Sequence, residues 1–146
     1  MAVRRTTPGR WLLALTLAFT GRVVAQPLAA LTGWPFLPPF DAWQSGALPY
    51  PVLLASQVLL IVVMARTAWA IGEGRLRPSR RLGWLLAAFT GLYGGVMGAR
   101  LVLGLTIARG HWWLDAPLPT VFHLVLTTYL AIVVHHHLRE VPDAPH

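Results

Sequence analysis

The 146-residue chain contains no cysteine, which excludes disulfides, thiolate zinc sites, iron–sulfur clusters and thiol redox chemistry. It also contains no lysine, so arginine supplies every basic residue other than histidine. Charged residues make up only 12% of the chain and hydrophobic residues 55%. No stretch is long and polar enough for a separate soluble domain, so we expect residues 1–146 to form a single transmembrane domain.

Long apolar runs are what the sequence has in abundance. There are four, and each reaches or nearly reaches the roughly 20 residues that a helix needs to cross a hydrocarbon layer about 30 Å thick. In the bilayer core, only a helix satisfies every backbone polar group within its own segment. The sequence therefore predicts an all-α membrane protein with four transmembrane helices in an up-down bundle, at approximately 11–31, 52–71, 82–107 and 120–137.

The arginines gather on alternate sides of these runs. Three precede the first run, four lie in segment 72–81 and one follows the fourth run, whereas segments 33–50 and 109–119 together hold a single arginine. By the positive-inside rule, both termini and segment 72–81 are predicted to be cytoplasmic. We ascribe the formal charge of +7 to this topology and to contact with anionic membrane lipids rather than to nucleic-acid binding, because the arginines flank the spans.

A cleaved signal peptide is the alternative for the first run, since two early arginines resemble an n-region and residues 23–25 resemble a cleavage site. Two features favour retention of the run as a membrane helix. Arg22 lies just before that site, and apolar residues continue through Leu31. Cleavage would give a mature protein that begins near Gln26.

The third run contains two overlapping pairs of glycines spaced by four, Gly91 with Gly95 and Gly94 with Gly98. Glycines four apart share a helix face and let another backbone or a flat ligand approach closely. We expect helix packing on this face. A groove for a porphyrin, quinone or lipid chain, and a homodimer contact, are the alternatives.

Prolines alternate with aromatic residues in the two outward segments, 33–51 and 109–119. Proline prevents these segments from continuing a spanning helix, and amphipathic rings favour the headgroup level of a membrane. The sequence therefore predicts interfacial outer loops anchored by tryptophan. A lid over a site that opens outward is the functional alternative.

Polar residues inside the spans are the candidates for a site, because a charge near the bilayer centre costs at least ~2.5–3.5 kcal/mol. Counted inward from the outer helix ends at about 1.5 Å per residue, their depths run from roughly 6 Å for His123 to roughly 15 Å for Arg22. No acidic residue lies in this layer, so the arginines are expected to pair with backbone or amide oxygens, with Asp41 or Asp115, or with an external anion. The candidate ligand-binding residues are Arg22, Gln26, Gln57, Tyr93, Arg100 and His123.

Two interpretations compete for this layer. In the structural one, the glutamines and His123 form hydrogen bonds across the bundle while the arginines extend to the outer headgroups. In the functional one, the layer binds a lipid phosphate, a quinone carbonyl or a haem propionate. Haem has little support, because His123 is the only histidine well inside a span and leaves Met97 as the second axial ligand.

Three consecutive histidines, 135–137, resemble a metal motif but lie about 100° apart on a helix, so they cannot share one ion. We expect them to form a cytoplasmic cap at the headgroup level and predict no metal site. No catalytic arrangement of serine, histidine and carboxylate is found in the spans, so nucleophilic catalysis is not expected and no catalytic residue is predicted.

The outward segments and the helix ends beside them contain Gln26, Leu37-Pro38-Pro39, Trp43, Ser45-Gly46, Leu48-Pro49-Tyr50-Pro51, Gln57, Pro119 and Phe122-His123. In these residues the chain resembles small uncharacterised bacterial four-helix integral membrane proteins. The resemblance implies a bacterial inner membrane and adds nothing about function.

Together these features predict a non-catalytic inner-membrane protein with an outward-facing polar site. It would be an accessory subunit of a larger membrane complex or a module that binds a lipid or quinone, alone or as a homo-oligomer. The alternative is a redox enzyme subunit that uses a bound haem or quinone.

The topology is testable with single cysteines, because the chain has none of its own. In intact cells, Asp115→Cys should react with a membrane-impermeant thiol reagent and Ser79→Cys should not, since the arginines place these positions on opposite sides. Labelling of Ser79→Cys alone would invert the topology.

Overall fold

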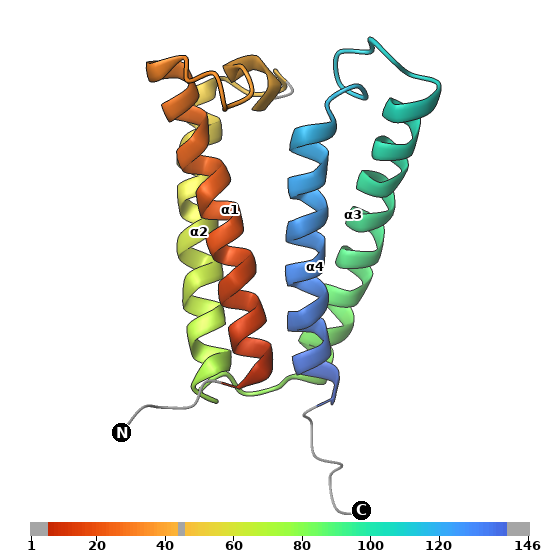
Figure 1. Ribbon diagram of the computed structural model, residues 1–146. Coiled ribbons are helices and arrows are strands. Elements are labelled where there is room, and N and C mark those ends of the chain that lie inside the picture. The colour runs from red at the N-terminus through yellow and green to blue at the C-terminus, as the bar shows by residue number, and fades with distance from the viewer. Residues whose placement is uncertain (1–5, 44–45, 140–146) are drawn as a thin grey trace, which may run out of the picture.

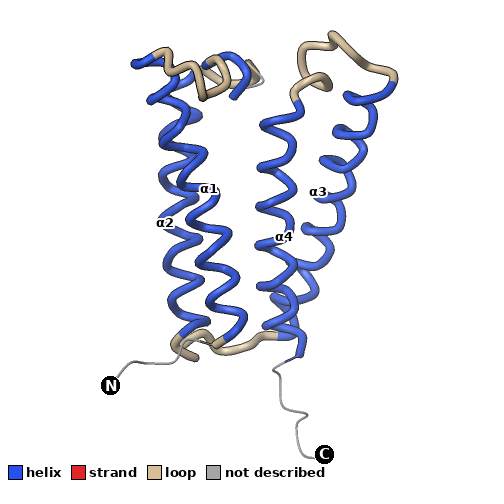
Figure 2. Tube along the Cα trace, in the orientation of Figure 1, coloured by secondary structure: helices blue, strands red, loops and turns tan. Residues whose placement is uncertain are grey.

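The structure is a computed structural model that describes residues 6–43 and 46–139. Four α-helices run through this part of the chain: α1 (Thr7–Thr32), α2 (Tyr50–Gly72), α3 (Arg80–Thr106) and α4 (Pro117–Arg139) (Figure 1). A single 3-10 turn, η1 (Phe40–Trp43), lies between α1 and α2, and the described residues contain no strand (Figure 2). The predicted all-α bundle of four spanning helices is confirmed.

Each helix begins two to four residues before its predicted start. The apolar runs mark only the part of each helix that lies in hydrocarbon. The first turn of each helix extends beyond that part and can contain proline and polar residues. Pro8 and Pro51 occupy the first turns of α1 and α2, and Pro117 opens α4. At the start of α3, the Ser79 hydroxyl accepts a hydrogen bond of 3.4 Å from the backbone N–H of Leu82.

The helices form two antiparallel hairpins. One consists of α1 and α2, the other of α3 and α4, and α1 packs on α4 to join them, whereas α2 and α3 share no extensive contact. Figure 1 shows the hairpins close together at the end that carries the linker 73–79 and farther apart at the end that carries the loops 33–49 and 107–116. We call these the linker end and the loop end.

The buried core lies between the hairpins and is built mainly from α1, α2 and α4, with Leu12, Phe19 and Met64 among its members. The Tyr129 hydroxyl of α4 donates a hydrogen bond of 2.7 Å to the carbonyl oxygen of Met64 on α2, which ties the two hairpins together. Large hydrophobic side chains are exposed along α1, α2 and α3, and α4 exposes Val121 near its start. Such a surface suits contact with lipid, and the helices are long and apolar enough to cross it, so the chain is a multi-pass membrane protein.

Two of the three consecutive histidines hold the linker instead of facing the headgroups. His136 Nε2 lies 3.1 Å from the carbonyl oxygen of Leu76, and His137 Nδ1 accepts a hydrogen bond of 3.1 Å from the backbone N–H of Ser79. His136 and His137 are buried, and only His135 is exposed. The predicted headgroup-level cap is therefore wrong for two of its three members, which fix the connection between the hairpins.

The glycines of α3 face in different directions. A Cβ on Gly94 would lie 2.6 Å from Thr127 of α4, and one on Gly104 would clash with the carbonyl oxygen of Leu114. Added to Gly91 or Gly95, a Cβ would meet nothing within 4 Å. The expected helix packing is thus confirmed for Gly94 and wrong for the Gly91–Gly95 pair, which faces away from the bundle, and for Gly98, where a Cβ would also meet nothing within 4 Å.

These two environments on one helix predict opposite effects of the same substitution. Gly104→Ala should lower the free energy of unfolding by about 1–3 kcal/mol, because the loop backbone must move away from the new methyl group. Gly95→Ala should leave it unchanged or raise it by up to about 1 kcal/mol through helix propensity. Equilibrium unfolding in mixed micelles, followed by circular dichroism, measures both. An equal loss in Gly95→Ala would show that its face is packed, as in a homodimer.

Candidate functional site

A pocket with a volume of about 520 Å³ lies between the two hairpins, towards the loop end. All four helices contribute to its walls, together with Leu48 from the first loop. Most of the lining is apolar. Its polar members are Arg22, Ser56, Gln57, Tyr93 and His123.

The pocket opens along the flank of the bundle. Three of its lining residues, Ser56, Leu59 and Val63, are exposed and follow α2 over about 10 Å of its length. This rim exists because α2 makes no extensive contact with α3, which leaves the space between the hairpins uncovered on that side. The pocket is therefore open sideways, on the flank of the bundle that α2 leaves uncovered.

Arg22 holds the first loop onto the bundle. Its Nη2 donates a hydrogen bond of 2.8 Å to the carbonyl oxygen of Trp43, to which Gln26 Nε2 also donates at 3.2 Å. The Arg22 guanidinium lies 5.2 Å from the centre of the Phe122 ring of α4. Arg22 and Gln26 are one helical turn apart on the same face of α1, and both are buried, so the loop folds inward to meet them.

Arg100 holds the second loop onto the bundle. Its Nε donates a hydrogen bond of 2.9 Å to the carbonyl oxygen of Trp113, and its guanidinium stacks 4.4 Å from the centre of the Trp113 ring. Arg100 is 2% exposed and Arg22 is 7% exposed. The interpretation in which both arginines extend to the outer headgroups is therefore wrong. Among the partners expected for these arginines, the structure provides backbone oxygens, those of Trp43 and Trp113.

Tyr93 and His123 form a polar pair across α3 and α4. The Tyr93 hydroxyl lies 2.5 Å from His123 Nδ1, and the two rings meet edge to face at 5.9 Å between their centres. The positive charges of Arg22 and Arg100 both act on the His123 imidazole. The pair thus presents a hydroxyl and an imidazole to the pocket in a positive electrostatic field.

Several buried polar atoms near the pocket have no hydrogen-bond partner among the described residues. A buried polar atom without a partner costs about 1–3 kcal/mol, more when it carries charge. Two of these atoms are donors of the buried arginines and two are glutamine oxygens. They are Arg22 Nε, Arg100 Nη2, Gln26 Oε1 and Gln57 Oε1.

Neither Arg22 nor Arg100 forms an ion pair with a carboxylate of residues 6–43 and 46–139. The one ion pair found there joins Arg75 to Glu73 at the linker end. Asp115 accepts a hydrogen bond of 2.6 Å from the backbone N–H of Gly110 instead of pairing with an arginine. The loop end of the bundle therefore carries buried positive charge that only backbone oxygens and aromatic faces stabilise.

Four of the six predicted site residues line the pocket together: Arg22, Gln57, Tyr93 and His123. Gln26 lies beside them on the Trp43 carbonyl, and Arg100 acts on His123 through its charge without lining the pocket.

Sequence reasoning missed two kinds of group. The first is Ser56, an ordinary polar residue within an apolar run, and the second is the pair of tryptophan carbonyls that anchor the arginines. A backbone oxygen leaves no residue-type signal, because its role depends on the path of the loop.

The fold and the pocket define a four-helix membrane protein with a buried polar site. No protein-family model, curated protein or solved structure matches the chain. The described part of the chain contains no group of three or more histidine, cysteine or acidic residues that could hold a metal ion.

The anchoring role of Arg100 can be measured against that of Arg109. Arg100→Leu should speed hydrogen exchange of the 107–116 loop amides by tenfold or more, because a charge-assisted hydrogen bond is worth roughly 1.5–3 kcal/mol. Arg109→Leu is the matched control, since Arg109 is exposed and donates only to the carbonyl oxygen of Leu105 at 3.3 Å. Exchange mass spectrometry reads out both. An unchanged loop in Arg100→Leu would contradict the anchor.

Proposed function

We propose that this protein is a non-catalytic binding module of a bacterial inner membrane, whose pocket takes an amphipathic ligand with an anionic headgroup. The ligand is a lipid or a lipid-like acid of the outer leaflet, and the protein acts alone or as an accessory subunit of a larger membrane complex. Outer-leaflet placement follows from the arginine-based topology, which puts the loop end outside.

The observation that carries this proposal is the buried charge of Arg22 and Arg100, with which no carboxylate of the described residues forms an ion pair. A guanidinium in a low-dielectric site is stabilised most by a full negative charge, whereas a carbonyl oxygen supplies only part of one. Arg22 lines the pocket, and its Nε has no partner there. An anionic headgroup next to this nitrogen would satisfy the donor and offset the charge.

The rest of the pocket suits an acyl chain. Phe19, Leu60 and Leu126 form apolar walls about one turn farther from the loop end than Arg22, Gln57 and His123, and Leu53 adds an apolar side chain nearer that end. Because the rim on α2 faces lipid, a ligand can enter from the membrane with its tail still in hydrocarbon. Such a site needs no passage through the outer loops.

A quinone-binding redox subunit is the second candidate, and the Tyr93–His123 pair favours it. A hydroxyl or imidazole that can donate a proton is suited to a quinone carbonyl, and this pair lines the pocket. Haem fits less well, because His123 is the only histidine among the lining residues, so no second histidine can clamp the iron from the other side.

Three probes of similar apolar character separate these candidates: oleate, its uncharged methyl ester and decylubiquinone. Native mass spectrometry of the purified protein measures their binding. Oleate should bind at least tenfold more tightly than the ester, and Arg22→Gln should abolish this preference, because a charge-assisted hydrogen bond is lost. Arg109→Gln is the control, since it removes the same charge from the exposed loop surface.

Equal binding of oleate and its ester would overturn the anionic ligand. Tighter binding of decylubiquinone than of oleate, lost in His123→Phe, would favour the redox subunit instead. Extraction of the protein as purified from membranes, followed by mass spectrometry of lipids and quinones, identifies the natural ligand.

A further inference from the structure

The second helix carries an arginine, Arg66, inside its span. The count of arginines that flank the spans does not include it. Arg66 lies six residues before the end of α2, about 9 Å inside the helix terminus. It is exposed on the outside of the bundle. In a membrane this side chain faces lipid, where a charge without a counter-ion is costly.

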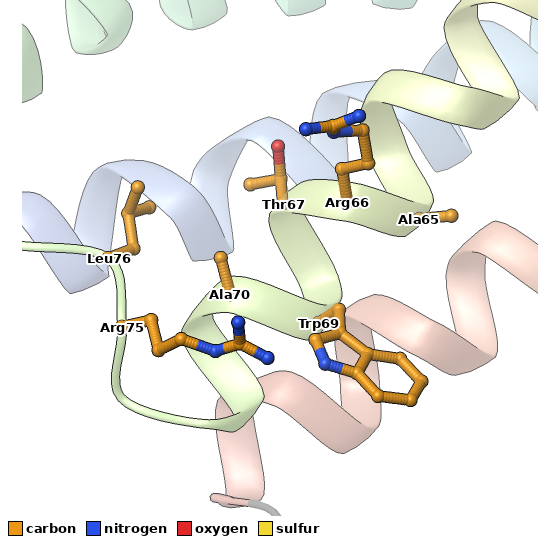
Figure 3. Close-up of a pocket in the computed structure, with 7 residues that line it drawn as sticks. All are labelled: Ala65, Arg66, Thr67, Trp69, Ala70, Arg75 and Leu76. Carbon is orange, nitrogen blue, oxygen red and sulfur yellow. The ribbon is translucent and has the colours of Figure 1, made fainter.

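Arg66 borders a second pocket, with a volume of about 650 Å³, at the linker end. Figure 3 shows Arg66 on α2 and Arg75 on the linker on either side of the short Ala70 side chain, with the Trp69 indole nearby. Ala65 and Leu76 complete the apolar part of the wall. The pocket thus combines two guanidinium groups with an apolar surface, and it lies at the opposite end of the bundle from the pocket between the hairpins.

The floor of this second pocket is fixed by the backbone. The N–H groups of Arg75 and Leu76 both donate to the carbonyl oxygen of Ala70, at 2.8 and 3.2 Å. The Arg75 side chain is paired with Glu73 through Nε and Nη2, which leaves its Nη1 available. Glu73 is therefore already engaged, and no carboxylate of the described residues pairs with Arg66.

Exposed tryptophans mark the headgroup level at this end of the bundle. Trp11, Trp69 and Trp84 are 62%, 51% and 61% exposed, and each lies within about two turns of the linker-end terminus of its helix. Tryptophan prefers this boundary between hydrocarbon and headgroups. Arg66 is only one turn deeper than Trp69, so its long side chain is within reach of a phosphate at this level.

We infer that this second pocket binds one anionic phospholipid of the cytoplasmic leaflet. The lipid phosphate lies between Arg66 and the free Nη1 of Arg75, and an acyl chain packs on Ala65 and Ala70. The positive charge selects an anionic headgroup over a zwitterionic one, since choline would bring a cation next to two arginines. This site is independent of the function proposed for the pocket between the hairpins.

The test compares phosphatidylglycerol with phosphatidylcholine of identical acyl chains, bound to the purified full-length protein in micelles and measured by native mass spectrometry. Wild type should prefer phosphatidylglycerol, and Arg66→Gln should weaken its binding about fivefold. Arg77→Gln is the matched control, because Arg77 is an exposed linker arginine outside the pocket. The affinity of Arg77→Gln for phosphatidylglycerol should stay within about twofold of wild type. Ala70→Leu fills the pocket without changing the charge and should also weaken binding.

Equal losses in Arg66→Gln and Arg77→Gln would overturn the site and indicate diffuse attraction to the arginine-rich linker. Equal binding of the two lipids by wild type would overturn it as well. Oleate binding at the loop end should not change in Arg66→Gln. The two pockets are therefore judged separately, and failure of one leaves the other standing.

Discussion

Two arginines buried at membrane depth must find acceptors, and this requirement shapes the loop end of the protein. Arg22 and Arg100 each bond to the carbonyl oxygen of a tryptophan in the loop that follows their helix. The aromatic loops are therefore drawn inward onto the bundle, where Trp43 becomes buried and Leu48 closes one side of the pocket. Without these bonds, two charged groups would be left without acceptors in a low-dielectric layer, and each loop would lose one of its links to the bundle.

The two ends of the bundle differ in how closely the hairpins pack. At the linker end, His136, His137 and the turn after α2 fix the connection between the hairpins, and α1 packs closely on α2 where Gly9 meets Gly72. At the loop end the hairpins diverge, and the space between them is lined by polar groups from every helix. The linker end thus holds the hairpins together, whereas the loop end leaves a pocket between them.

The number, type and approximate limits of the helices followed from the sequence, because four apolar runs have few other structures open to them. Counting depth along the helices also grouped residues that line one pocket, such as Gln57 and His123. The sequence did not predict the direction in which each residue faces. Lipid and protein core are both apolar, so no one-sided stripe reveals which face of α3 turns inward. For this reason the pair Gly91 and Gly95 was assigned to a packed face.

The partners of the two buried arginines also bear on how the protein is made. Trp43 follows Arg22 by 21 residues and Trp113 follows Arg100 by 13, so each bond closes within one hairpin. Each arginine can therefore be hydrogen-bonded by the loop of its own hairpin before the other half has been synthesised. Neither bond waits for the contact between α1 and α4 that joins the hairpins, so the two halves can meet with their buried charges already supplied with an acceptor.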